Sequence, residues 1–404
     1  MLAARLPLNA MILEQLTITL MNPLPEPRPR RHDIDALRVL AFLILIFYHV
    51  GMLYVANWGF HIKSIYQYDW VKFPMLLVNQ WRMPLLFLIS GVASSFLIGK
   101  LNAIGFIKSR SLRLLVPFIA GVILVIPPQA YIESLANGSI SKNFGDMSYL
   151  GFLIHYFSFQ EWPAGAFDGS EYGFTWNHLW FIPYLFAYTL LLVPIAKLLR
   201  ISGLYVWFVR IGSLMLVLVP VIIQIIWQLT LNDEKAISHA LVDDWYAHAM
   251  YGTYFLLGYL ISDNTAIWQK IINLRWISLI GALFCYCLLI ALWLKFNQHE
   301  WQDHLEGLVA TFNQWLWLLA VLAWSAKLLN RPQAWLKYAN NCIYPWYILH
   351  QTITIIAAYF LAKLSLGGPI EFTLVLTATI FGCWGITEYF IRRQKRMRLL
   401  FGMT

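Results

Sequence analysis

Ten runs of about twenty mostly apolar residues follow one another along this 404-residue chain, joined by short connections. A helix rises about 1.5 Å per residue, so about twenty residues cross the roughly 30 Å hydrocarbon layer of a bilayer. Only 12% of the residues are charged, about half the share of a soluble domain. The runs predict an all-α, polytopic membrane bundle of about ten transmembrane helices. The expected spans are 36–55, 74–98, 114–131, 178–197, 211–231, 245–262, 276–295, 306–326, 343–363 and 370–391.

Proline and arginine interrupt three of these expected helices. Pro127 and Pro128 lie in the third run and Pro220 in the fifth, so we expect both helices to kink or end there. Arg82 lies inside the second run, where burying a charge in hydrocarbon is costly. A charge at such a position is a candidate for function.

The basic residues alternate between the two ends of the expected bundle. Of the 29 lysines and arginines, 21 lie in every second connection. Because cytoplasmic loops are rich in Lys and Arg, these connections predict the cytoplasmic side, with both termini inside. This topology accounts for the net charge of +9, so no nucleic-acid partner is expected. The basic segments are 28–38, 100–113, 197–210, 263–275, 327–337 and 392–398.

The chain divides into a single membrane domain with short flanking parts. Residues 1–34 are a Pro- and Arg-rich lead-in that we expect to be flexible, residues 35–395 the membrane domain, and residues 396–404 a short basic cytoplasmic tail. Met21 opens the Pro/Arg-rich part, and we expect translation to start there. The four cysteines lie in apolar runs without zinc-ligand spacing, so we expect no metal site.

The longest expected outside segment, 132–177, carries five carboxylates against one lysine. Its stretch Tyr149–Phe159 is aromatic. Aromatic residues are enriched where a membrane meets water, so we expect this stretch to lie along the outer interface.

Arg38 and His49 share one stripe of the first expected helix. They are eleven residues apart, which places them within about 20° of one face and about 16 Å apart along the axis. His49 either bonds to a neighbouring helix for packing or acts as a general base near mid-depth. Arg82 is expected at a similar depth, and a guanidinium beside an imidazole disfavours the charged form of the imidazole. The shared stripe therefore favours catalysis by His49, with Arg82 stabilising an oxyanion.

Arg110 and Arg113 are one turn apart at the inner end of the third run. Together with Arg38 they would suit the phosphates of a ligand, because arginine pairs bidentately with phosphate. Simple topology signalling explains them equally well, and the sequence leaves both interpretations open.

Other polar residues of the spans are weaker candidates. His178 and Trp180 lie at the outer end of the fourth span, where they either belong to the aromatic belt or form a platform for a sugar ring. His350 is either a satisfied core group or functional, and Glu388 is expected to pair with a cytoplasmic arginine. The remaining loop histidines, which include His155 and His239, show no metal spacing and receive no role.

Several motifs run collinearly over about residues 32–395. They are Asp35-Ala-Leu-Arg38 with His49, Arg82-Met-Pro-Leu-Leu-Phe-Leu-Ile-Ser-Gly91, Arg110-Ser-Leu-Arg113-Leu-Leu-Val-Pro117, His178-Leu-Trp180-Phe181, Tyr254-Phe-Leu-Leu-Gly258, Asn340-Asn-Cys-Ile-Tyr344 with His350, and Glu388. In this order they resemble the acyltransferase 3 family of integral membrane acyltransferases. Within that family the chain is most similar to the glucan biosynthesis protein C branch, which succinylates periplasmic glucans.

The resemblance implies transfer of an acetyl or succinyl type of group from a cytoplasmic acyl-coenzyme A to a carbohydrate hydroxyl on the far side of a bacterial inner membrane. His49 would be the base or a transient acyl carrier, with Arg82 also catalytic, while Arg38, Arg110 and Arg113 would hold the donor phosphates. The acceptor-binding or supporting residues would be Asp35, His178, Trp180, His350 and Glu388. Acyl-coenzyme A is a co-substrate, and no bound cofactor is expected.

We expect no fused extracytoplasmic domain like that of larger family members, so a second transfer protein, if needed, would be a separate periplasmic partner. The alternative function is a secondary transporter or proton-coupled permease, in which buried His and Arg would form a proton relay. We find no inverted repeat in the sequence to support it.

Overall fold

The structure, a computed structural model, describes residues 30–231, 237–262, 264–295 and 300–403. Met21, at which we expect translation to start, lies outside these residues. Throughout the described part the regular structure is helical, without strands, which confirms the predicted all-α membrane bundle. The long helices are α2 His32–Met52, α3 Lys72–Ile98, α4 Ala103–Leu124, α5 Ile126–Ala136, α8 Phe181–Ile201, α10 Ser213–Leu231, α11 Trp245–Ile261, α13 Arg275–Lys295, α14 Glu300–Leu328, α15 Ala334–Leu361 and α16 Gly368–Ile386.

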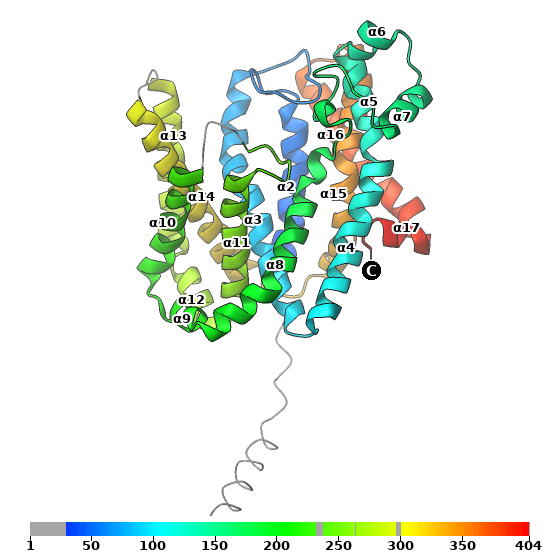
Figure 1. Cartoon of the computed structure of the whole chain (residues 1–404). Helices are drawn as coiled ribbons and strands as arrows, with labels where there is room; N and C mark the ends of the chain where they lie inside the picture. Colours follow the sequence, from blue (N-terminus) through cyan, green and yellow to red (C-terminus); the bar gives the residue numbers. More distant parts are fainter. Residues whose placement is uncertain (1–29, 232–236, 263, 296–299, 404) are drawn as a thin grey trace, which may run out of the picture.

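Nine segments of the described chain are long and apolar enough to cross a membrane. The remaining expected span corresponds to α11, whose 17 residues cover about 26 Å. It is nevertheless packed inside the bundle, mainly along α3 (Figure 1).

The prolines act differently in the two helices that they interrupt. α4 ends at Leu124 and α5 begins at Ile126, with the Pro127-Pro128 pair in its first turn, where proline is tolerated. The prediction of a break is confirmed there. α10, in contrast, runs through Pro220 from Ser213 to Leu231.

Most of the basic connections lie at one end of the molecule, whereas the basic helix α17 Lys395–Leu400 lies at about mid-height beside α4 (Figure 1). Figure 1 shows the short helices α9 Leu204–Arg210 and α12 Thr265–Asn273 near the start of α4, whereas α6 Ser139–Phe144 and α7 Tyr149–Phe157 lie at the opposite end. We call these the inner and the outer end. The sequence predicts that the inner end faces the cytoplasm.

α2 is the central helix. It packs against α3 on one side and α15 on the other, and it also contacts α14 and α16 (Figure 1). α3 and α11 approach each other very closely, because a Cβ atom at Gly91 would collide with the Phe255 carbonyl, and one at Gly258 with the Leu88 carbonyl. Small residues permit such close packing in membrane bundles.

The outer segment has a small core of its own, formed by Phe152, Tyr156, Trp162 and Phe167. α7 therefore buries one face, while Leu150 and Ile154 on its other face are each 67% exposed.

At the chain's other end, α17 Lys395–Leu400 precedes the buried Phe401, so the basic tail is folded against the bundle along α4.

Candidate active site

A cavity of about 890 Å³ lies beside the outer half of α2. Side chains of α2, α3, α11 and α15 line it, and the connections 168–176 and 237–240 line its outer part. His49, Arg82, His178 and Trp180, which the sequence singles out, all line this cavity. The structure thus brings together four of the predicted site residues, which come from three separate parts of the chain.

His49 lies in the last turn of α2, closer to the outer end than expected. The reason is that α2 runs from His32 to Met52, so it starts four residues and ends three residues before the predicted span 36–55. His350 lies directly behind His49, fully buried, with its Nε2 atom 2.8 Å from Nδ1 of His49 and the two rings parallel within 3°.

The hydrogen bonds of His350 determine which nitrogens carry protons. Its Nδ1 atom lies 2.6 Å from the carbonyl oxygen of Tyr347 and 3.2 Å from that of Trp346, so Nδ1–H donates and Nε2 accepts. His49 must then donate from Nδ1, which leaves its Nε2 with a free lone pair. This is the tautomer that a general base requires.

His178 is the third histidine of this group and lies in the 3-10 turn Asn177–Trp180 before α8. Its ring meets that of His350 edge-on at 5.0 Å and that of His49 at 6.4 Å. Nε2 donates to the carbonyl of Ile348 at 3.1 Å, and Nδ1 is buried without a hydrogen-bond partner among the described residues.

Arg82 contributes a positive charge to the same cavity. Its guanidinium lies over the ring of Tyr48, 3.4 Å from the ring centroid, and donates to Asn79 Oδ1 at 2.8 Å. Its Nε atom is buried without a partner, and no carboxylate of the described residues forms an ion pair with it. Such a charge favours anions, including an oxyanion that forms during a reaction.

His61, which lines the cavity, pairs with a glutamate behind it, and sequence reasoning missed this pair. His61 Nδ1 lies 2.7 Å from Glu133 Oε2, and both side chains are about 10% exposed. Burial alone would lower the pKa of His61, but the Glu133 carboxylate outweighs it and raises the pKa above its ordinary value. Glu133 also accepts a hydrogen bond from the backbone N–H of Asp168 at 2.9 Å, which ties α5 to the outer segment.

His239 is the second residue that the sequence did not reveal. It lies in the connection 237–244 and its ring stacks on Trp180, with ring centroids 4.0 Å apart. In the sequence this histidine has no motif around it. Only the folded connection brings it to the cavity.

The predicted donor-binding arginines form a separate group at the inner end. Arg38, Arg110 and Arg113 lie near enough for their charges to interact, yet none of them lines the cavity. Arg110 is buried and donates to Ser94 Oγ at 2.8 Å. Asp35 lies 3.7 Å from Arg38 and is the one carboxylate of the described chain in ion-pair contact with this group.

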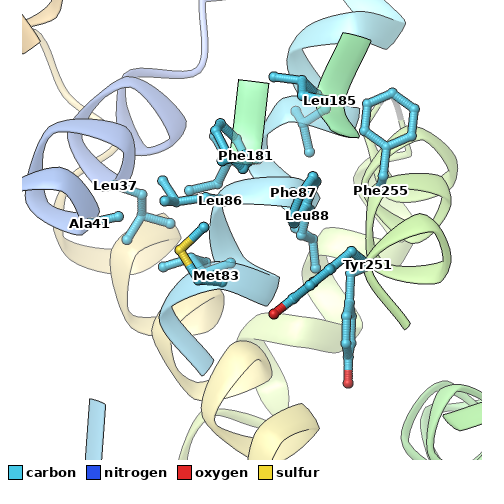
Figure 2. Close-up of a cluster of buried hydrophobic side chains, with 14 of the residues drawn as sticks. Leu37, Ala41, Met83, Leu86, Phe87, Leu88, Phe181, Leu185, Tyr251 and Phe255 are labelled. Carbon is cyan, nitrogen blue, oxygen red and sulfur yellow. The ribbon is translucent and has the colours of Figure 1, made fainter. Parts of the chain in front are cut away.

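Figure 2 shows a buried apolar cluster between α2 and α3, and on α2 its residue Ala41 lies between Arg38 and His49. Leu37 and Ala41 of α2 belong to it, together with Met83 and Leu86 of α3. Behind them, the ring of Phe87 packs on that of Phe181 at 4.6 Å. The two parts of the predicted site are thus separated by packed side chains in this conformation.

Glu388 lies away from the cavity. It follows α16 in the π-helical turn Thr387–Ile391 and forms an ion pair with Arg392 at 2.7 Å, as expected, while the hydroxyl of Tyr338 donates to it. Like Asp35, it is not brought to the histidines, so the structure gives neither residue a contact with the cavity.

The sequence is similar to known proteins. A family model described as an acyltransferase domain matches residues 31–388. The chain is 24% identical over 183 residues to the glucans biosynthesis protein C of Escherichia coli strains K12, SMS-3-5 and O139:H28, which covers 45% of this chain and 42% of each relative. The chain therefore spans about two fifths of the length of these relatives. No solved structure matches it.

Proposed function

The chain belongs to the acyltransferase 3 family of integral membrane proteins, and from this premise we propose that it transfers an acyl group from acyl-coenzyme A to a carbohydrate hydroxyl. The relatives named glucans biosynthesis protein C support a glucan as the kind of acceptor. The acyl group is of acetyl or succinyl type, and the protein acts in a bacterial inner membrane.

The observation that carries this proposal is the hydrogen bond from His49 Nδ1–H to His350 Nε2. It holds the lone pair of His49 Nε2 ready to accept the proton of an acceptor hydroxyl, which is otherwise a poor nucleophile. The hydroxyl oxygen forms a bond to the thioester carbon, and the thiolate of coenzyme A leaves and takes up the proton. Arg82, for which the described residues supply no counter-ion, stabilises the negative oxygen of the intermediate. In a two-step variant, His49 itself accepts the acyl group first.

The donor is held at the inner end in this proposal. Coenzyme A carries phosphates that suit Arg38, Arg110 and Arg113, and its pantetheine arm is thin enough to follow α2 toward His49. The apolar cluster of Leu37, Ala41 and Leu86 must then part to let it pass. The acceptor occupies the cavity from the outer end, delivered if necessary by a separate periplasmic protein.

The test is acyl transfer by the purified protein in lipid nanodiscs. Acetyl- or succinyl-coenzyme A and a short glucose oligosaccharide are supplied, and the product is detected by its added mass. We expect His49→Ala to abolish transfer while the protein still inserts and folds. Full activity of a well-folded His49→Ala variant would refute the role of His49. Unchanged glycan masses in cells that lack the protein would refute the reaction.

A further inference from the structure

The connection 237–244 has an unusual backbone. His239, Leu241 and Asp243 have φ angles of 57°, 66° and 66°, in the left-handed region that residues other than glycine rarely adopt. Leucine has no side-chain hydrogen bond to compensate for this conformation. A backbone of this kind persists only where surrounding contacts hold it, and such backbones cluster at binding sites.

Contacts from two helices hold this connection. Asp244 Oδ2 accepts the hydroxyl hydrogen of Tyr184 at 2.6 Å and the backbone N–H of His239 at 3.0 Å. The Tyr184 hydroxyl in turn accepts the N–H of Leu241 at 3.0 Å, and His248 Nε2 donates to the Leu241 carbonyl at 2.6 Å. The backbone is thus fixed on both sides of residue 240.

These hydrogen bonds fix the position of the His239 ring. It lies on the indole of Trp180, with an angle of 30° between the ring planes, and both residues line the cavity. The backbone carbonyl of His239 is itself held by Trp176 Nε1 at 3.1 Å. Within the described chain neither ring nitrogen of His239 has a hydrogen-bond partner.

His239 is uncharged near neutral pH. Burial, with a smaller contribution from Arg82, lowers its pKa to about 4 against the opposing effect of Asp244 and Asp168. A neutral imidazole has one donor and one acceptor nitrogen, so it can bind two hydroxyl groups at once. A sugar carries several hydroxyl groups, each of which can donate or accept a hydrogen bond.

Two neighbouring groups are also unpaired. Neither the indole N–H of Trp180 nor the hydroxyl of Tyr251 has a hydrogen-bond partner among the described residues, and both side chains line the cavity. The ring centroids of Trp180 and Tyr251 are 5.5 Å apart. An aromatic wall with unsatisfied polar groups at its edge suits a ligand that has an apolar face and many hydroxyls.

We propose that His239, held on Trp180 by the braced connection 237–244, is a specificity-determining residue that binds hydroxyl groups of the carbohydrate acceptor. This inference rests on the proposed function, because it concerns the acceptor of the same reaction. It assigns His239 to acceptor binding and leaves the chemical step to His49.

The test compares His239→Phe with the wild type in nanodiscs, with the short glucose oligosaccharide as acceptor. Phenylalanine keeps the stacking on Trp180 and removes both hydrogen-bonding nitrogens. We expect the acceptor KM to rise about tenfold, while kcat and the KM for acyl-coenzyme A stay within about twofold, since one or two hydrogen bonds are lost. His239→Gln, which keeps one donor and one acceptor, should restore most of the affinity.

The matched control is His155→Phe. His155 is another histidine of the outer segment, packed edge-on against Trp162 at 4.4 Å, and it does not line the cavity. An unchanged acceptor KM in His239→Phe, or an equal rise in His155→Phe, would overturn the inference. If His239→Phe does not fold, His239→Gln is compared with Trp180→Phe instead. An acceptor KM of His239→Gln as high as that of Trp180→Phe would also overturn the inference. A wild type without transferase activity would instead refute the proposed function.

Discussion

The imidazoles of His49 and His350 lie parallel, with Nδ1 of the first 2.8 Å from Nε2 of the second. His350 is bound at its other nitrogen by the carbonyls of its own helix, so it acts as a fixed acceptor. In the histidine–carboxylate pairs of hydrolases, the carboxylate selects the tautomer of the catalytic histidine, and His350 is placed to do the same for His49. Here the partner is an imidazole, so in the proposed mechanism it orients His49 without adding a negative charge.

Replacing His350 by Phe should reduce kcat about a hundredfold, because His49 loses the acceptor that selects its tautomer. The KM values for donor and acceptor should change little, since His350 is buried behind His49 and does not line the cavity. Steady-state kinetics measure both quantities. His350→Gln, which can present an oxygen to His49 Nδ1–H, should recover part of kcat. Equal losses in both variants would indicate a purely structural role.

Replacing Arg110 and Arg113 together by Ala should chiefly raise the KM for acyl-coenzyme A, by about tenfold or more, because phosphate contacts are lost. The measurement is the donor dependence of initial rates at a saturating acceptor concentration. Lys395→Ala with Arg396→Ala is a control that removes two positive charges outside this group. A rise only in the acceptor KM would assign the two arginines to another role.

Replacing Glu133 by Gln should destabilise the protein, by about 3 kcal/mol, because it breaks a largely buried ion pair. The pKa of folded His61 is raised above its unfolded value of about 6.5, so the pair's contribution is complete below that pH. It decreases as the pH rises through the folded pKa. The Tm difference between variant and wild type should therefore be largest in mild acid and shrink in alkali. A difference independent of pH would contradict this explanation.

Replacing Gly258 by Ala should destabilise the bundle by about 3 kcal/mol, because the new methyl group collides with the Leu88 carbonyl and pushes α3 away from α11. Thermal unfolding in detergent measures this effect. Gly385→Ala in α16 is the control, since a Cβ there meets no atom within 4 Å. A normal Tm for Gly258→Ala would show that α3 and α11 can separate at little cost.

Much of the fold follows from local properties of the sequence. Apolar runs and prolines predict the spans and the α4–α5 break, since a helix in lipid must satisfy its own backbone. Helical geometry also places Arg38 and His49 on one stripe of α2. The convergence of His49, Arg82 and His178 depends on helix packing, and it could be expected only from the cost of burying polar groups in a membrane.

The remaining parts of the site depend on long-range contacts that no local pattern encodes. His239 reaches the cavity because Asp244 bonds to Tyr184, sixty residues earlier in the chain. Glu133 is one of five carboxylates of the outer segment, and only the path of the chain after α2 brings His61 to it. The tautomer of His49 likewise depends on His350, some three hundred residues away.

The apolar cluster between the inner arginines and the histidine cavity affects the passage of ions through the bundle. The cavity reaches His49 from the outer end, and the apolar side chains of Ala41, Met83 and Leu86 fill part of the space between His49 and the inner arginines. Charged species cross such a dry stretch only at great cost. In the proposed reaction, this packing keeps ions from following the acyl group across the membrane.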